Sequence, residues 1–355
     1  MSEVASVRVS QTSVDPETVF RAVKEAMKLI DWEKRVKKGT IILKINAVWD
    51  HLYPSCTTSP MVIEGVLRVI LASKKAKASD ITVVDTDTAA IMRADQSFKI
   101  QGIEALAKRY GVHLANLTNT EFEEVEFNGL VLKKLKISRL LLKADNIITL
   151  PVLKTHSYSG MTGGLKNQWG CIHDLRLNYH LVLQEAIVDV NSFFKDRISF
   201  GLVDALFGMD GKGPKAGRPR KVGYIFASVD LVSLDSAAAS VMGFSPGEIK
   251  HITFAEKEGL GSTKFHVVGN PLPSFHFEPA TSANIVMGSE MWFRRLGPKV
   301  EWLMFSPHSP IFFCLRLAAK IYYDIWYFAV GKKVAAKMLQ TNYGQMWSKR
   351  YLEAL

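Results

Sequence analysis

Residues 151–170 combine side chains that can bind anions and transfer protons with a glycine pair. The segment carries Lys154, His156 and Lys166 on either side of Gly163 and Gly164. It overlaps the end of an apolar run, residues 146–153, which predicts a buried strand. A strand that ends in such a loop presents its polar groups at the carboxyl edge of a sheet, where open α/β folds bind ligands. We expect this loop to form the floor of a site, against the alternative of an ordinary solvated loop.

Two lysines and two histidines are the candidate catalytic residues. Lys154 and Lys166 supply positive charge for a carboxylate or phosphate, and a desolvated lysine among cations can serve as base or nucleophile. His156 is the first candidate for proton transfer, because its unperturbed pKa lies near neutrality. His180 is the next, although a histidine in a helix such as residues 178–188 is more often a packing or surface residue.

A second set of residues is expected to bind a substrate or cofactor through charge, neutral hydrogen bonds and backbone amides. The Gly-x-Gly pattern at residues 211–213 has a lysine within it and could hold an oxyanion, although its spacing fits neither a Walker loop nor a dinucleotide fingerprint. The members of this set are Lys44, Asn46, Thr58, Gly163, Gly164, Asn167, Gly211 and Gly213.

Aspartates at the ends of predicted strands are candidate ligands for a divalent cation. They are Asp85, Asp87, Asp204 and Asp230. Carboxylate oxygens are the ligands that hard cations require. Each aspartate could equally cap the helix that follows it. Asp235, in the first turn of a predicted helix, is interpreted in the same way, as a capping or helix-dipole group.

The three cysteines, Cys56, Cys171 and Cys314, lie far apart in the sequence. This spacing argues against a disulfide framework and against a clustered metal or iron–sulfur site. No iron–sulfur cluster is therefore expected, whereas a divalent metal or a nucleotide-like cofactor remains open. A reducing, cytoplasmic compartment fits best, and the first residues show no pattern typical of export.

Strand and helix patterns alternate along the chain, which predicts mainly parallel sheets with crossover helices. We expect two α/β domains, residues 1–150 and 151–288, with strand-end loops that form a cleft between them. Residues 289–355 are expected to form a basic, aromatic and hydrophobic helical tail. Asp15-Pro16 and Ser59-Pro60 are typical helix starts.

The formal net charge of +11 over 355 residues makes the surface attractive to anions. The expected partner is an anionic small molecule. Specific nucleic-acid binding is not expected, because the chain shows no recognition helix and no aromatic RNA-binding signature. Oligomeric state is open, and a homodimer is one alternative.

The tail contains a long apolar stretch that is interrupted by three charges. Arg316, Lys320 and Asp324 recur every four residues and so form one narrow polar stripe on a helix. A wide apolar face with basic flanks suits a helix that lies in a membrane interface. Packing against the body or in a homodimer, and a true membrane span, are the alternatives. Residues 347–351 are expected to add another basic aromatic contact.

The order of these motifs resembles the family catalogued as domain of unknown function 362, over about residues 5–270. The residues that carry the resemblance are Lys44-Ile-Asn46, Thr58-Ser-Pro60, Val84-Asp85, Lys154-Thr-His156, residues 162–167, His180, residues 187–191, Val203-Asp204, residues 211–214, Asp230 and Asp235. The resemblance implies no settled activity. Many members carry a ferredoxin-like cysteine cluster, which this chain lacks, so electron transfer is not implied.

Residues 156–170 also resemble the His…Ser-Gly-Gly-x-Lys loop of nickel-pincer lactate racemases. In those enzymes two α/β domains close over a nucleotide-derived cofactor, so the resemblance implies cofactor attachment at Lys166. Asn167 and Trp169 depart from that pattern.

Two functions follow from these observations. The first is an enzyme that binds a carboxylate or phosphate in the cleft, with proton-transfer or cofactor-assisted chemistry by His156 and Lys166. The alternative is a non-catalytic protein whose basic surface binds anions, lipid or nucleic acid. Convergence of the basic residues in one concave cleft would favour the enzyme, and a stripe of them on a convex face would favour the alternative.

Overall fold

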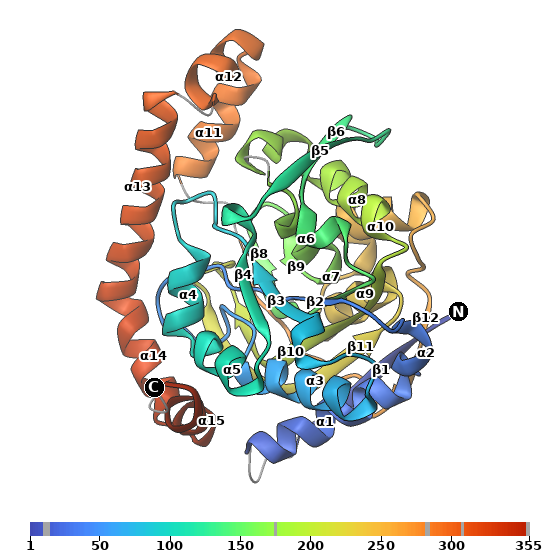
Figure 1. The fold of residues 1–355 in the computed structure, drawn as a ribbon. Helices are drawn as coiled ribbons and strands as arrows, with labels where there is room; N and C mark the ends of the chain where they lie inside the picture. The colour runs from blue at the N-terminus through green and yellow to red at the C-terminus, as the bar shows by residue number, and fades with distance from the viewer. Residues whose placement is uncertain (10–14, 174–175, 281–284, 307–308, 353–355) are drawn as a thin grey trace.

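A ten-stranded mixed sheet forms the centre of the molecule (Figure 1). The computed structural model describes residues 1–9, 15–173, 176–280, 285–306 and 309–352. The strands of the sheet are β1 (Ser2–Arg8), β2 (Ile41–Lys44), β3 (Ile81–Asp85), β4 (His113–Asn116), β7 (Asn146–Thr149), β8 (Val152–His156), β9 (Gly160–Thr162), β10 (Ile198–Asp210), β11 (Arg218–Ser228) and β12 (Phe265–Gly269). A separate antiparallel hairpin consists of β5 (Phe122–Glu126) and β6 (Lys134–Ser138).

Five neighbouring strands, in the order β10-β7-β2-β3-β4, run parallel to one another. β11 joins β10 in antiparallel orientation, and β1 and β12 complete that side. The predicted α/β fold with mainly parallel strands is confirmed. Strands from both predicted domains join this one sheet, because β7 pairs with β10. The boundary expected at residue 150 falls between β7 and β8 of the same sheet.

Helices cover both faces of the sheet. Those of the body are α1 (Pro16–Leu29), α2 (Trp32–Arg35), α3 (Pro60–Ser73), α4 (Ala94–Ile100), α5 (Ile103–Tyr110), α6 (Arg139–Leu142), α7 (Gly164–Asn167), α8 (Leu183–Phe194), α9 (Leu231–Met242) and α10 (Lys250–Lys257). Ile41 and Leu43 of β2 pack into the core with α1 and α3, whereas Ile42 packs into the core with α8 and α9. Because alternate side chains of a strand point to opposite faces, a strand covered on both faces is apolar throughout.

Two helix starts predicted from the sequence are confirmed. Asp15 Oδ1 accepts a hydrogen bond of 2.6 Å from the backbone N–H of Thr18, and Pro16 begins α1. Ser59 Oγ accepts one of 3.2 Å from the N–H of Met61 at the start of α3. These caps satisfy backbone donors that have no partner within the helix. The start of α3 also fixes the path of the loop that follows β2.

The C-terminal segment forms helices on the outside of this body. They are α11 (Ile285–Arg295), α12 (Pro298–Phe305), α13 (Pro310–Trp326), α14 (Lys332–Leu339) and α15 (Asn342–Trp347), with a π-helical segment (Tyr327–Gly331) between α13 and α14. α13 lies along one side of the body, with α11 and α12 at one end and α14 and α15 at the other (Figure 1). No helix in the described part of the chain is both long and apolar enough to cross a membrane.

The aromatic residues Trp347 and Tyr351 anchor the last described turns to the body. Trp347 and Tyr351 are fully buried in the core that contains α1 and α3, so their aromatic contacts are with the body. Trp347 Nε1 donates to the carbonyl of Gln101 at 3.1 Å. The buried carboxylate of Glu64 accepts hydrogen bonds from Arg350 Nη2 at 2.5 Å and from the Tyr351 hydroxyl.

Candidate functional site

A cavity of about 280 Å³ lies at the carboxyl ends of β2, β3 and β8, and the C-terminal helices close its other side. Eight of the residues singled out in the sequence line it. They are Lys44, Asn46, Asp85, Lys154, His156, Lys166, Asn167 and His180. The carboxyl ends of parallel strands meet at one edge of a sheet, which explains why residues so far apart in sequence converge there.

Positive charge dominates the cavity wall. Among the described residues, six lysines and arginines line the cavity against two carboxylates, Asp85 and Glu290. The cations are Lys44, Lys154, Lys166, Arg176, Lys215 and Arg316. The basic residues therefore converge in one concave site, which is the arrangement that favours small-anion binding over a basic stripe.

Lys44 and Asp85 form a buried ion pair at the ends of β2 and β3. The Lys44 Nζ lies 2.7 Å from Asp85 Oδ1 and also donates to the carbonyl of Ile45. Asp85 accepts backbone N–H hydrogen bonds from Ala47 at 2.5 Å and Thr86 at 2.8 Å. Asp85 is thus engaged with lysine and backbone donors, and it fixes the two loops that carry the polar wall.

A hydrogen-bonded chain of side chains connects β2, β8 and α7. Lys154 Nζ donates to Asn46 Oδ1 at 2.5 Å, and Asn46 Nδ2 donates to Asn167 Oδ1 at 3.0 Å. Asn167 Nδ2 in turn donates to the carbonyl of Lys44 at 3.0 Å. Burial lowers the pKa of Lys154 to about 8. Within the described part of the chain, Lys154 Nζ donates to Asn46 Oδ1 and to the carbonyl of Cys56, and neither acceptor carries a charge that would hold its proton.

Lys166 has the chemistry of a base at neutral pH. Desolvation lowers the pKa of its amine to about 7, and the nearby charges of Arg176, Lys154 and Lys44 act in the same direction. A substantial fraction of the amine is therefore uncharged near neutrality. An uncharged amine next to fixed cations can accept a proton or act as a nucleophile.

His156 is neutral in this environment. Burial and the neighbouring Lys166 and Lys154 hold the pKa of its imidazole well below its usual range. The backbone N–H of Tyr158 donates to His156 Nδ1 at 3.1 Å, so the neutral ring carries its proton on Nε2. The near-neutral pKa expected from the sequence is therefore absent, because desolvation disfavours the imidazolium. His156 can donate a hydrogen bond from Nε2.

The glycine pair holds a carboxylate of the protein. The N–H groups of Gly164 and Leu165 donate to Asp235 at 2.6 Å and 3.0 Å. A Cβ on Gly163 would collide with the same carboxylate. Asp235 therefore caps α7, which carries Lys166. The prediction that Asp235 caps its own helix, α9, is wrong. Asp230 performs that second role, accepting from the N–H of Val232 at 2.8 Å.

Three further predicted binding residues shape the site from outside the cavity wall. Thr58 Oγ1 donates to the carbonyl of Leu150 at 2.6 Å and accepts from the N–H of Asn46 at 2.9 Å. The carbonyl of Gly211 accepts from Thr155 Oγ1 at 2.5 Å. A Cβ on Gly213 would collide with the backbone carbonyl of Thr155. The glycines allow this loop to pack closely on β8.

The four aspartates expected to bind a metal hold protein groups at separate places. Asp85 pairs with Lys44 and Asp230 caps α9, as described above. Asp87 Oδ1 accepts from the N–H of Ala94 at 2.8 Å, and Asp204 Oδ2 accepts from the N–H of Ser59 at 2.7 Å. Burial raises the pKa of Asp204 to about 6. In the described residues these four do not gather into a ligand group.

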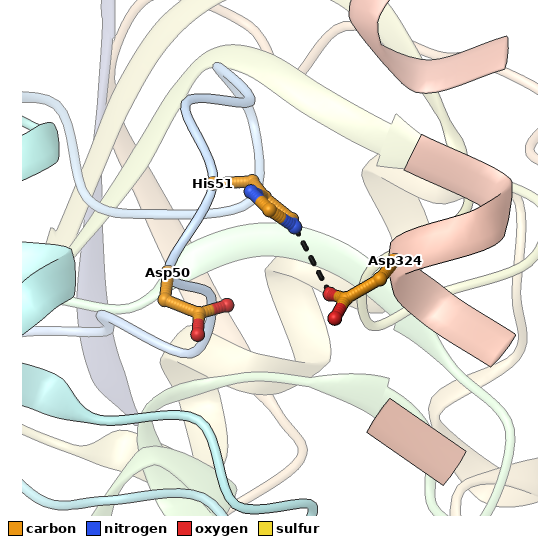
Figure 2. Close-up of side chains that lie close together, drawn as sticks. All are labelled: Asp50, His51 and Asp324. Carbon is orange, nitrogen blue, oxygen red and sulfur yellow. Dashed lines mark hydrogen bonds and ion pairs between the residues drawn. The ribbon is translucent and has the colours of Figure 1, made fainter. Parts of the chain in front are cut away.

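The group of potential metal ligands that does gather is Asp50, His51 and Asp324, shown in Figure 2. His51 Nε2 lies 3.0 Å from Asp324 Oδ1. The ammonium of Lys320 lies 2.9 Å from Asp324 and 3.4 Å from Asp50, so a cation already stands between the carboxylates. We therefore interpret the group as an ion-pair network that fastens α13 to the loop after β2.

Three residues of the cavity were missed by sequence reasoning. Arg176 donates to the carbonyl of Asp87. Glu290 of α11 accepts from the hydroxyl of Tyr158 at 2.9 Å and lies 2.9 Å from His180 Nδ1. Lys215 is buried, and burial lowers its pKa to about 8. Lys215 lies in the glycine-rich segment 208–217, and that composition could have identified it as a residue of the site. Arg176 and Glu290 follow no predicted strand, so no sequence pattern pointed to them.

The two buried cysteines, Cys56 and Cys171, lie where a thiolate is disfavoured. Desolvation raises the pKa of the buried Cys56 thiol, and it raises that of Cys171 to about 12. A reactive cysteine needs a stabilised thiolate. We therefore interpret both residues as packing side chains.

Known proteins place this chain more clearly by family than by reaction. A thylakoid-associated protein from Synechocystis is 31% identical over 138 residues, which are 36% of this chain and 42% of that protein. The chain thus matches less than half of the length of that relative. The lactate racemase apoprotein from Thermoanaerobacterium thermosaccharolyticum shares 14% identity, with a TM-score of 0.43 over 66% of this chain and 56% of that chain.

A protein from Thermotoga maritima gives a TM-score of 0.40 at 14% identity, over 69% of this chain and 60% of that one. Neither structural similarity supports a conclusion about chemistry. The family match is broader, since it extends over residues 41–240, which contain β2, β3, β8, α7 and most of the cavity's polar wall. The chain belongs to the family described as a domain of unknown function, DUF362.

Proposed function

We propose that the protein is an enzyme that binds an anionic small molecule, a carboxylate or a phosphate, and transfers a proton with Lys166. The excess of cations over carboxylates around one cavity is the observation that carries the proposal. A buried positive site binds anions strongly, because the low dielectric strengthens charge interactions and the charges are already in place.

The cavity residues have separate tasks in this proposal. Lys44 and Arg176 supply positive charge for the bound anion. Lys166, whose pKa is lowered to about 7, accepts the proton as the free amine. His156 donates a hydrogen bond from Nε2 to an oxygen of the ligand, as a neutral imidazole does. Lys154 and Asn46 hold the floor of the site in place.

Isothermal titration calorimetry with inorganic phosphate tests this function. At pH 6, where the Lys166 amine is protonated, we expect Lys166→Met to weaken phosphate binding at least tenfold, because it removes a charge but keeps the length of the side chain. Lys299→Met, on the exposed surface, is the matched control and should leave the affinity unchanged. Equal affinities for the wild type and both variants would exclude Lys166 from the anion site.

A nucleotide-like cofactor or a metal-bound anion would be a special form of such a ligand. Native mass spectrometry with elemental analysis of the purified protein tests this. A stoichiometric adduct that is lost in Lys166→Ala or His156→Ala would identify the bound group. A mass equal to that of the chain alone would indicate that the anion is a freely exchanging substrate.

A second function, association with an anionic membrane surface, is supported by the orientation of α13. In the fully described stretch 310–331, every exposed residue is uncharged, whereas Arg316, Lys320 and Asp324 are partly buried. Arg316 Nε donates to the carbonyl of Ala89 at 2.7 Å, so the polar stripe faces the body.

The apolar face therefore points outward and carries Phe313, Leu317, Ile321, Ile325 and Phe328, all more than a third exposed. Basic residues flank it at both ends, with exposed Lys299 on one side and Lys332, Lys333 and Lys337 on the other. An apolar face with cationic flanks fits an anionic lipid surface. The relative named as thylakoid-associated is in keeping with this proposal.

A further inference from the structure

We propose that the cavity binds an amphiphile, an anionic head group attached to a single hydrocarbon chain. The inference rests on the proposed function, since the head group is the anion that the cationic wall binds. What it adds is the tail, and with it the substrate class. The observation behind it is that the two sides of the cavity have opposite chemistry.

The side of the cavity opposite the strand ends is mainly apolar and aromatic, with Glu290 and Arg316 as its charged residues. It is formed by the C-terminal helices through Phe293, Phe305, Phe312, Leu315, Ala319 and Tyr322. Phe305 and Phe312 are almost fully buried, with rings 5.8 Å apart in an edge-on arrangement. A small hydrophilic anion would gain nothing from such a wall, whereas a hydrocarbon chain gains about 0.8 kcal/mol for each methylene that it buries.

The size of the cavity agrees with a ligand larger than a simple anion. Its volume is about 280 Å³. One water needs only about 10–15 Å³ of such space. A phosphate or carboxylate bound to Lys166 and Lys44 would therefore leave most of the cavity empty on the aromatic side.

The two sides also come from different parts of the sequence. The charged residues from the strand ends, Lys44, Lys154 and Lys166, lie within the family match at residues 41–240. The apolar residues listed above all lie after residue 289, outside that match. The proposed tail-binding side therefore lies outside the part of the chain that matches the family.

α13 connects this wall with the outer apolar face of the molecule. Ala319 and Tyr322 line the cavity, and Ile321 and Ile325 are exposed on the same helix. Tyr322 belongs to both regions, because it lines the cavity and its side chain is 41% exposed. A chain whose head group is held at the strand ends can thus leave the cavity beside Tyr322, toward the surface proposed to meet lipid.

Titration calorimetry with a series of anions of increasing chain length tests the inference. The probes are inorganic phosphate, butyl phosphate and octyl phosphate, with acetate, pentanoate and nonanoate as the carboxylate series, all below their micelle concentrations. We expect the affinity to rise roughly threefold to fourfold for each buried methylene in at least one series.

Two neighbouring alanines provide the matched variants. Ala319→Phe fills the apolar side and should abolish the gain with chain length while inorganic phosphate still binds. Ala318→Phe places the same ring on the exposed face of α13 and should leave the whole series unchanged. Leu315→Asn, a second change in the cavity wall, should also reduce the gain with chain length.

The possible failures are distinguishable. If the short anions bind but affinity does not rise with chain length, the amphiphile is excluded and the proposed anion site stands. If the gain persists in both Ala319→Phe and Leu315→Asn, the chains bind elsewhere and the inference is overturned. If none of the probes binds, inorganic phosphate included, the proposed function itself fails.

Discussion

Asp235 is expected to affect the site although it lies outside the cavity. It does not line the cavity, yet it accepts two backbone hydrogen bonds at the start of the short helix that carries Lys166. We predict that Asp235→Asn lowers stability by about 1–3 kcal/mol, because the amide replaces an acceptor with a donor among buried N–H groups. We also expect weaker phosphate binding, since Lys166 is then poorly positioned.

Urea unfolding and phosphate titration measure the two effects of Asp235→Asn. Asp230→Asn is the control, because Asp230 caps α9 and does not line the cavity. It should cost about 1 kcal/mol of stability and leave the affinity unchanged. A fully retained phosphate affinity in a destabilised Asp235→Asn would reduce Asp235 to a purely structural role.

The lowered pKa values of the cavity lysines predict how anion binding depends on pH. An amine is cationic below its pKa, and these values are about 7 for Lys166 and about 8 for Lys154 and Lys215. The affinity for sulfate, which stays a dianion over this range, should therefore be highest below pH 7. As the pH rises through 7 and 8, each lysine that contacts the anion should lower the affinity by up to tenfold per pH unit above its own pKa.

Sulfate titrations between pH 6 and 9 check this dependence. In Lys166→Met the decline that begins near pH 7 should disappear, while the decline set by Lys154 and Lys215 remains. An affinity for sulfate that stays constant from pH 6 to 9 would show that all three lysines keep their protons throughout.

At the level of helices, the C-terminal anchor depends on one carboxylate. Glu64 of α3 is buried and is held by Arg350, Tyr351 and Tyr110, whose hydroxyl donates at 2.6 Å. These hydrogen bonds hold the pKa of Glu64 below its usual value, although burial alone would raise it. The helical turn that carries Arg350 and Tyr351 is therefore fixed to the body through the buried carboxylate of Glu64.

We predict that Arg350→Ala destabilises the protein by about 1–2 kcal/mol, because the Glu64 carboxylate loses its hydrogen bonds from a partly exposed guanidinium while Arg109 stays 4.0 Å away. The neighbouring exposed residue supplies the control, Lys349→Ala, which should change stability by less than about 0.5 kcal/mol. Denaturant unfolding compares the two. Similar midpoints for both variants would mean that the anchor carries little of the stability.

At the scale of the whole molecule, the outward apolar face of α13 predicts binding to vesicles that contain anionic lipid. Phe313→Glu combined with Ile321→Glu should abolish flotation with such vesicles, because both side chains would enter the lipid as charges. Leu130→Glu is the control, since Leu130 is 46% exposed elsewhere on the surface. The alternative is that a second copy of the chain covers this face. Light scattering of the free protein would then show a dimer, and the double variant would be a monomer.

Much of the polar half of the site followed from local patterns in the sequence. An apolar run that ends in Lys44, Asp85 or Lys154 predicts a strand end, and the ends of parallel strands meet at one edge of a sheet. The four-residue spacing of Arg316, Lys320 and Asp324 likewise predicted one polar stripe on a helix. The strand ends at Lys44 and Asp85 are confirmed, because strand direction is a property of neighbouring residues. The run 146–153 was wrong as a single strand, since it divides into β7 and β8 and Lys154 lies within β8.

The remaining features depend on how distant segments dock. The stripe on α13 faces inward because Arg316 and Lys320 find partners at Ala89 and Asp50, which no pattern within the helix encodes. Asp235 caps α7 and not α9, and the low pKa of His156 arises from burial near two lysines. The sequence thus specified which residues stand at the strand ends and on each helix face. Long-range packing set their partners, their protonation and the direction that the apolar face of α13 takes.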